Sequence, residues 1–172
     1  STTLRKAEGV ANMMVREIQA LTQLPPHPHI IKLHKVLHSR RRIFIFLEYA
    51  GSSNLLQVQK REPGHRLSIQ LIRTLFRDAV DAVAFLHANN IVHRDLKPEN
   101  IVVSSEGIAK LVDFGLVDKF DQRLTDGCGS LPFAAPEVLD VPRGGYLGGP
   151  ADAFALAIIL FEAIHGAHTV SQ

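Results

Sequence analysis

Apolar residues recur along the chain at spacings that predict three long helices. Within Ala7–Leu24 they return every three or four residues, the pattern of a helix with one apolar face, and Pro25-Pro26 ends that helix. A second helix is predicted over Ile69–Ala88, with Ser68 as its N-cap and an apolar face wide enough to be largely buried. The stretch Asp152–Ile164 is apolar along most of its length and is predicted to be a core helix.

Short runs of β-branched and aromatic residues, separated in pairs by polar turns, predict two β-hairpins. Their strands are Ile30–Leu37 with Ile43–Glu48, and Ile101–Val103 with Ala109–Val112. A short helix is predicted at Leu55–Val58. Asp118–Phe133 is polar and rich in turn-forming residues, so we expect a mobile loop there. Gly144–Pro150 is expected to be a plain loop, because no strand leads into it and no lysine follows, as a phosphate-binding loop would require.

Composition and charge narrow the class of protein. The chain has 172 residues, 46% of them hydrophobic, which suits one domain or slightly more. A net charge of +2 gives no basis for expecting nucleic acid or an anionic membrane as a partner. The single cysteine, Cys128, rules out an internal disulfide and suits an intracellular compartment, cytoplasmic or nuclear. Ser1–Val10 shows no secretory signal, and the most apolar run, Ala153–Ile164, is too short to span a bilayer.

Three motifs carry the candidate chemistry. Ile91–Asn100 reads Ile-Val-His-Arg-Asp-Leu-Lys-Pro-Glu-Asn, Asp113-Phe114-Gly115 begins thirteen residues after Asn100, and Ala135-Pro136-Glu137 begins twenty-two residues after Asp113. In this order and spacing they resemble the catalytic loop, metal-binding triplet and activation-segment anchor of the protein kinases. Taken singly, an acid at either of the first two motifs could be a turn-forming residue, but their joint spacing favours the kinase interpretation.

The resemblance implies an α+β, two-lobe kinase fold of which the chain holds a part. Residues 1–48 would be a partial N-lobe with one helix and a hairpin, 49–53 the hinge, and 54–172 a mainly helical, partial C-lobe. The glycine-rich loop and the strand with the ATP-binding lysine would precede Glu17 and are not found in the sixteen residues before it. The last helices of the C-lobe, with the arginine that pairs with the acid at Glu137, are also not found.

The same resemblance assigns roles in phosphoryl transfer from ATP to a protein hydroxyl. Asp95 would accept the proton of the substrate hydroxyl, Lys97 would stabilise charge on the transferred phosphoryl group, and Asn100 and Asp113 would hold Mg²⁺. Oxygen ligands of this kind are what Mg²⁺ prefers.

Four further residues would serve ATP binding. Glu17 would pair with the ATP-positioning lysine, although by itself it could be one more solvated helix charge. Main-chain groups of Glu48 and Ala50 would hydrogen-bond the adenine edge, with Leu47 guarding the rear of the pocket.

Other positions indicate the kinase class and its regulation. Lys97, two places after the acid, and Ser130, where a hydroxyl bridges base and lysine, resemble serine/threonine kinases, closest to the calcium/calmodulin-kinase-like branch with its checkpoint and AMP-activated relatives. Arg94 would meet a phosphate on the activation segment. The usual phosphothreonine position is Asp126, so we hypothesise that Asp126 partly supplies that charge, with Thr125 as a candidate phosphosite. An ordinary acid on a solvated loop is the open alternative.

Two function classes follow. One is a serine/threonine kinase acting on protein substrates, with an upstream kinase or regulatory subunit as a further partner. The other is a non-catalytic, kinase-like binding or scaffold module, or an inactive fragment, because the ATP lysine is not found. The set Asp95, Lys97, Asn100 and Asp113 favours the first, since a module without catalysis has no physical need for all four.

Overall fold

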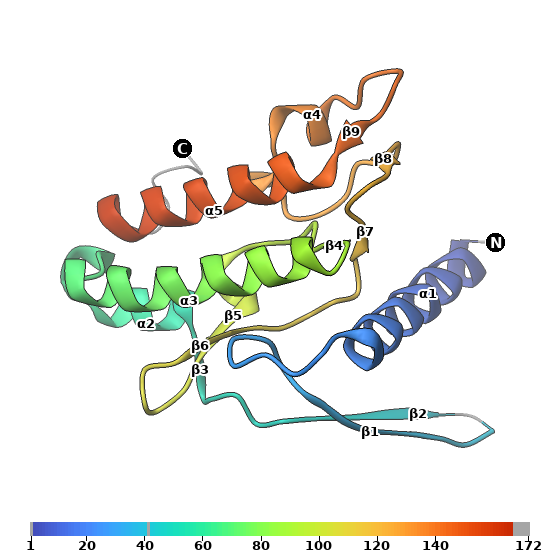
Figure 1. The fold of residues 1–172 in the computed structure, drawn as a ribbon, viewed down its shortest axis with the longest axis horizontal. Helices are drawn as coiled ribbons and strands as arrows, with labels where there is room; N and C mark the ends of the chain where they lie inside the picture. The colour runs from blue at the N-terminus through green and yellow to red at the C-terminus, as the bar shows by residue number, and fades with distance from the viewer. Residues whose placement is uncertain (1, 41, 167–172) are drawn as a thin grey trace.

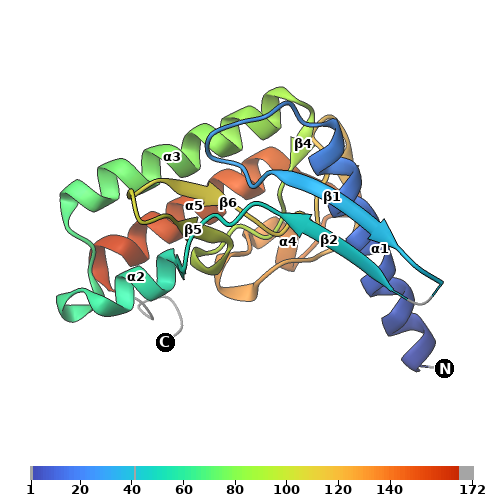
Figure 2. The same cartoon turned by 90° about the horizontal axis from the view of Figure 1, so that it is seen from below.

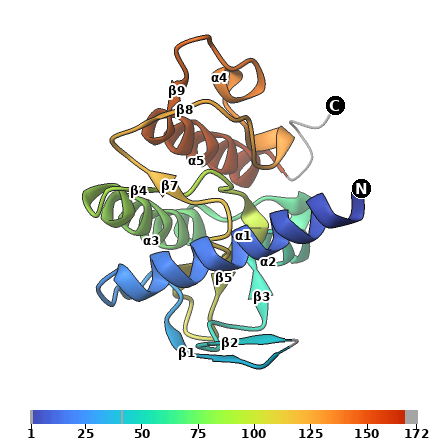
Figure 3. The same ribbon diagram turned by 90° about the vertical axis from the view of Figure 1, so that its right-hand side faces the viewer.

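The computed structural model describes residues 2–40 and 42–166, with side chains for residues 8–40 and 42–166. Within these residues a helix and a two-stranded hairpin form one part of the molecule, and helices with three small sheets form the other (Figure 1). This is the α+β content expected from the sequence. Figure 3 shows the hairpin at one end of the molecule and helix α4 (Pro136–Leu139) at the other.

The N-terminal part is helix α1 (Thr2–Gln23) followed by strands β1 (Leu33–His38) and β2 (Ile43–Leu47). The strands pair antiparallel, with one register irregularity between Leu33 and Lys35, so the predicted helix and first hairpin are confirmed. Only the C-terminal end of α1 packs on the core, where Leu21 is buried, whereas Val10 is exposed. The predicted apolar face is therefore covered only near its end.

Strand β6 (Ala109–Leu111) ties this N-terminal part to the rest of the molecule. The main chain of Leu111 accepts a hydrogen bond from Ile31 at 3.0 Å and donates one to His29 at 2.8 Å. Beside it, Lys110 Nζ pairs with Glu48 Oε1 at 2.6 Å. Because β6 ends two residues before Asp113, the strand that fixes the N-terminal part also places that acid.

The body of the molecule is built on helices α3 (Ile69–Ala88) and α5 (Gly148–His165), which lie side by side (Figures 1 and 2), with α2 (Leu55–Arg61) at one end. Helix α3 has the predicted bounds, and the Ser68 hydroxyl accepts a hydrogen bond from the Leu71 amide at 3.3 Å, as an N-cap does. Its apolar face is buried in the main core, which explains why periodicity alone located it.

Short strands connect these helices. The pairs are β3 (Ser53–Asn54) and β6 on either side of β5 (Ile101–Val103), β4 (Ile91–Val92) with β7 (Asp118–Lys119), and β8 (Arg123–Leu124) with β9 (Tyr146–Leu147), all antiparallel. The second predicted hairpin, β5 with β6, is confirmed.

Two segments predicted to be loops contain regular structure. Asp118–Phe133 supplies β7, β8 and a 3₁₀ turn at Leu131–Phe133, and Gly144–Pro150 supplies β9 and the first turn of α5. The loop prediction for Gly144–Pro150 was therefore wrong. Each of these strands has its partner at least twenty residues away, so no local pattern marks it.

Helix α5 begins at Gly148, four residues before the predicted start. A Cβ at Gly148 would lie 2.7 Å from Cγ2 of Val92, so glycine is needed for the close approach of the helix to β4. The helix has 18 residues and, by length and composition alone, could cross a membrane; our prediction that this run is too short is wrong. Half of the helix is buried in the fold, as is typical of a core helix.

Candidate active site

A buried carboxylate of α5 fixes the main chain of the Ile91–Asn100 segment. Asp152 is 1% exposed and accepts hydrogen bonds from the amides of His93 at 2.8 Å and Arg94 at 2.9 Å. The ring of His87, at the end of α3, lies 2.9 Å from the same carboxylate. Arg94 has a φ of 69°, a conformation that is costly for a residue other than glycine and that these contacts hold in place. The main chain directly before Asp95 is therefore held in place by Asp152.

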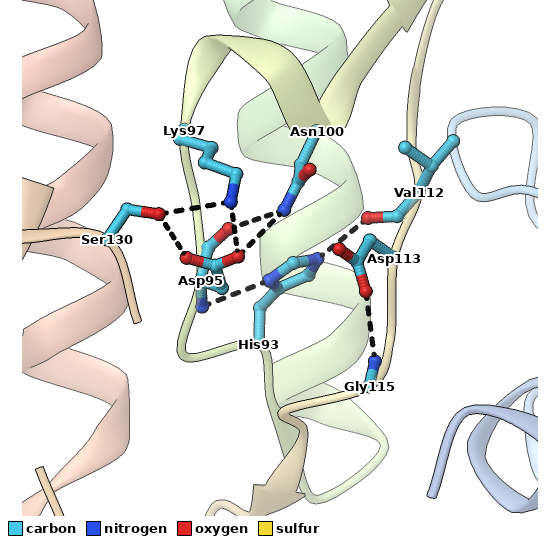
Figure 4. A network of polar contacts seen from close by, with 8 residues as sticks. All are labelled: His93, Asp95, Lys97, Asn100, Val112, Asp113, Gly115 and Ser130. Carbon is cyan, nitrogen blue, oxygen red and sulfur yellow. Dashed lines mark hydrogen bonds and ion pairs between the residues drawn. The ribbon is translucent and has the colours of Figure 1, made fainter. Parts of the chain in front are cut away.

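Asp95 is the centre of a polar cluster, shown in Figure 4. Its Oδ2 is 2.7 Å from Lys97 Nζ and accepts a hydrogen bond from Asn100 Nδ2 at 3.2 Å. Its Oδ1 accepts one from the Ser130 hydroxyl at 2.8 Å, and Lys97 Nζ also donates to that hydroxyl at 3.0 Å. Asp95 is thus buried among charged and polar groups rather than in apolar packing.

Asn100 and Asp113 are brought together by the main chain. The amide of Val112 donates to the carbonyl of Asn100 at 3.0 Å, which holds the residue before Asp113 against the 3₁₀ turn Pro98–Asn100. Asp113 has a φ of 64°, and its Oδ1 accepts a hydrogen bond from the Gly115 amide at 3.4 Å. Its Oδ2 and Asn100 Oδ1 have no hydrogen-bond partner among the residues described. Two free hard oxygens from an amide and a carboxylate fit Mg²⁺.

The ring of His93 separates Asp95 from Asp113 in Figure 4. Nδ1 accepts a hydrogen bond from the Asp95 amide at 3.3 Å, and Nε2 lies 3.3 Å from the carbonyl oxygen of Val112. An accepting Nδ1 requires that Nε2 carries the proton and that the ring is neutral. Burial lowers the pKa of His93, against the charge of Asp152 and the other acids, which agrees with a neutral ring. His93 therefore spaces the two acids without adding charge.

Helix α1 places Glu17 beside Asp113 and Phe114. Partial burial raises the pKa of Glu17, the charge of Asp113 raises it further, and a hydrogen bond from the Phe114 main chain opposes both. No cation pairs with Glu17 in the part of the chain that the structure describes, so the expected lysine partner has no counterpart there. The structure instead places Glu17 next to the Asp113 motif, a neighbour that the sequence did not predict.

The expected adenine-binding stretch follows β2. The Glu48 amide donates to the Lys32 carbonyl at 2.9 Å, and the Glu48 side chain binds Lys110. The carbonyl of Glu48 and both main-chain groups of Ala50 have no hydrogen-bond partner among the residues that are described. Leu47 ends β2 and is partly exposed. The stretch therefore carries free main-chain donors and acceptors beside an apolar side chain, as purine binding requires.

Arg94 joins the loop that carries Asp95 to the segment after Asp113. Its guanidinium is 3.0 Å from Asp118 Oδ2 and 2.8 Å from Asp126 Oδ1, and it also donates to the Asp126 carbonyl at 3.0 Å. Burial lowers the pKa of Arg94, but the hydrogen bond to Asp126 and the surrounding charges outweigh it and leave the pKa raised. Thr125, beside Asp126, is exposed. The structure thus brings Arg94 and Asp126 together as hypothesised.

Three residues of this arrangement were not predicted as site residues from the sequence. Asp118 pairs with Arg94, the Tyr146 hydroxyl donates to the Asp126 carbonyl at 3.1 Å, and His87 meets Asp152. None of them belongs to one of the three motifs, so only knowledge of its distant partner could have identified it.

Comparison with known proteins agrees with this geometry. A model of the protein kinase domain matches residues 2–172. The chain is 39% identical over 163 residues to CBL-interacting protein kinase 4 of Oryza sativa subsp. japonica, which covers 92% of this chain and 35% of that protein.

Two other relatives come from a mammal and a second plant. NUAK family SNF1-like kinase 2 of Rattus norvegicus is 37% identical over 153 residues, covering 88% of the chain and 24% of that protein. CBL-interacting serine/threonine-protein kinase 21 of Arabidopsis thaliana is 34% identical over 161 residues, covering 92% and 37%. The chain spans about a third of the length of the curated relatives it matches. With a family model that matches nearly its whole length, this chain belongs to the protein kinase domain family.

Proposed function

We propose that this chain supplies the catalytic loop and the magnesium-binding residues of a serine/threonine protein kinase, which transfers the γ-phosphoryl group of ATP to a hydroxyl of a protein substrate. The observation that carries the proposal is the ring of Lys97, Asn100 and Ser130 around the single carboxylate of Asp95.

Asp95 orients the substrate hydroxyl and accepts its proton as the oxygen attacks phosphorus. The carboxylate already accepts hydrogen bonds on both oxygens, which fixes its plane, and it retains lone pairs for one more donor. Fixing the acceptor matters because phosphoryl transfer gains most of its rate from positioning and charge neutralisation.

Lys97 neutralises charge on the phosphoryl group. Lys97 Nζ lies against Asp95 and Ser130, so a phosphoryl group approaching the hydroxyl meets a cation at the point of transfer. Asn100 and Asp113 would hold Mg²⁺, which would supply positive charge to offset the charge of the phosphate groups. The free oxygens of these two residues support this assignment.

The adenine of ATP binds beside β2. The free carbonyl of Glu48 and main-chain groups of Ala50 would meet the purine edge, with Leu47 at the rear of the slot. The ion pair between Glu48 and Lys110 fixes the adenine-binding stretch relative to β6. Because β6 leads to Asp113, the same strand determines the position of the adenine and of the residue that would hold the metal.

One observation favours the second function, a kinase-like module without catalysis. Glu17 has no cationic partner among the described residues, and its raised pKa reflects burial beside Asp113. The chain spans about a third of the length of CBL-interacting protein kinase 4. The two functions differ in whether the protein transfers a phosphoryl group.

The test compares wild type, Asp95→Asn and Asp113→Asn in the full-length protein. Asp121→Asn is the control, because Asp121 is exposed and makes no ion pair in the described structure. We expect Mg²⁺ with ATP, at about 100 times its dissociation constant, to raise the melting temperature of wild type by about 5 °C or more. Asp113→Asn should lose this shift, whereas Asp95→Asn should keep it and lose transfer to a serine peptide library. A shift without any transfer in wild type would support the non-catalytic module. No shift and no transfer in wild type would contradict the kinase proposal.

A further inference from the structure

Arg94 is a buried cation that is already matched by two carboxylates. Its side chain is 2% exposed, and its two terminal nitrogens reach Asp118 at 3.0 Å and Asp126 at 2.8 Å. A buried guanidinium is costly unless it is paired, so these acids are required by Arg94 rather than incidental to it. Both belong to the segment 118–130, which ends at the Ser130 contact with Asp95.

The pairing extends into a chain of alternating charges through space. Arg16 of α1 lies 3.9 Å from Asp118, which binds Arg94, which binds Asp126. Arg16 precedes Glu17 in sequence, and Arg94 precedes Asp95. The four charges therefore connect helix α1, strand β7, the catalytic loop and the segment leading to Ser130.

Main-chain contacts keep this segment close to the catalytic loop. Gly129 has a φ of 96°, and a Cβ there would collide with the carbonyl oxygen of Arg94. The Tyr146 hydroxyl donates to the Asp126 carbonyl at 3.1 Å. Because Ser130 follows Gly129 directly, any shift of the segment at Asp126 would move the hydroxyl that binds Asp95.

The net charge around Arg94 determines whether a phosphate on Thr125 is needed to hold segment 118–130. Two carboxylates face one buried guanidinium, so the local charge is balanced or negative without any modification. A phosphate on the exposed Thr125 would bring roughly two more negative charges beside Asp126 and Asp118, and like charges at such distances repel. One group opposes this view: Arg94 Nε is buried without a hydrogen-bond partner among the described residues, and its N–H is free to donate to a phosphate oxygen.

We propose that Asp118 and Asp126 are positioning residues that hold segment 118–130, and through it Ser130 and Asp95, in the active arrangement without phosphorylation of Thr125. The expected effect of these two acids on kcat rests on the proposed kinase function. Their expected effect on the order of segment 118–130 does not. This inference differs from the earlier hypothesis in assigning the charge to two acids, of which Asp118 was not foreseen.

The experiment measures hydrogen exchange in segment 118–130 and transfer kinetics, using the full-length protein before and after phosphatase treatment. The variants are Asp118→Asn, Asp126→Asn, the charge-preserving Asp126→Glu and Thr125→Ala, with Asp121→Asn as the exposed loop control. We expect Asp118→Asn and Asp126→Asn each to speed exchange and lower kcat by about tenfold, with KM for ATP changed less than about threefold. Asp126→Glu should restore protection, and phosphatase treatment, Thr125→Ala and Asp121→Asn should leave both readouts within about twofold of wild type.

The outcomes separate failure of this inference from failure of the proposed function. A tenfold loss of kcat on phosphatase treatment or in Thr125→Ala would overturn the inference, since a phosphate would then be holding the segment, with Arg94 Nε as its added contact. Unchanged exchange in Asp118→Asn and Asp126→Asn would overturn it as well. If wild type transfers no phosphate, the kinase proposal fails. Faster exchange in the two Asn variants would then still show that Asp118 and Asp126 hold segment 118–130 through Arg94.

Discussion

The hydroxyl of Ser130 donates a 2.8 Å hydrogen bond to Asp95, across 35 residues of sequence. The same hydroxyl accepts a hydrogen bond from Lys97 at 3.0 Å, so one small side chain orients both Asp95 and Lys97. A hydroxyl can donate and accept at once, which is why serine or threonine suits this position and alanine does not.

Replacing Ser130 with alanine should therefore lower kcat by about 10- to 100-fold, because Asp95 and Lys97 would each lose a fixed partner. Ser130→Thr retains the hydroxyl and is the matched control, with kcat expected within a few-fold of wild type. Steady-state kinetics at saturating ATP measure both. Equal loss in the two variants would show that volume rather than the hydroxyl matters at this position.

Asp152→Asn should destabilise the fold. The carboxylate accepts the amides of His93 and Arg94 and meets the ring of His87, and an amide side chain cannot accept all three. We expect a loss of about 2–4 kcal/mol in the free energy of unfolding, measured by urea denaturation. Asp140→Asn, at an exposed acid, is the control and should change stability by less than about 0.5 kcal/mol. Equal stability of Asp152→Asn and wild type would mean that the loop does not depend on this carboxylate.

Gly129→Ala should impair the site more than a comparable change in an open loop. At Gly129 the backbone is left-handed and a Cβ would collide with the Arg94 carbonyl, whereas at Gly144 a Cβ would meet nothing within 4 Å. We expect Gly129→Ala to cost about 1–3 kcal/mol of stability and to reduce kcat, because Ser130 must shift. Gly144→Ala should behave like wild type. Matching thermal melts and kcat for the two variants would contradict the close approach seen here.

The pH dependence of stability should carry a contribution from His93. Burial lowers its pKa, so the folded protein keeps the ring neutral while the unfolded chain takes up a proton near its ordinary value of 6.5. The unfolded state then binds more protons, and stability is lost as pH falls below about 6.5. His93→Gln should flatten the slope of the free energy of unfolding between pH 6.5 and 5, measured by urea titration. His38→Gln, on the exposed hairpin, is the control and should keep the wild-type slope. A slope unaffected by His93→Gln would assign the proton uptake to other groups.

Local patterns predicted the elements that depend on local physics. Helix α3 has the predicted bounds because Ser68 caps it and its apolar face has a regular period. The positions of Asp95, Lys97, Asn100 and Asp113 followed from spacing within recognisable motifs, and the structure places all four around one loop.

Features that depend on distant partners were missed. Strand β9 forms because it pairs with β8. The start of α5 at Gly148 depends on contact with Val92, whereas glycine by itself disfavours a helix. The pairing of Asp118 with Arg94 left no trace in a polar segment where one acid looks like another. Such contacts are set by the tertiary fold, which local propensity does not encode.

The most direct test of the account is the position of the metal. Crystals of the natural protein grown with Mn²⁺ in place of Mg²⁺ and a non-hydrolysable ATP analogue would show the metal by anomalous scattering. The account predicts a peak about 2.2 Å from both Asn100 Oδ1 and a carboxylate oxygen of Asp113, with the analogue's terminal phosphate facing Asp95. A bound analogue with the peak away from these two residues, or no peak at all, would contradict it.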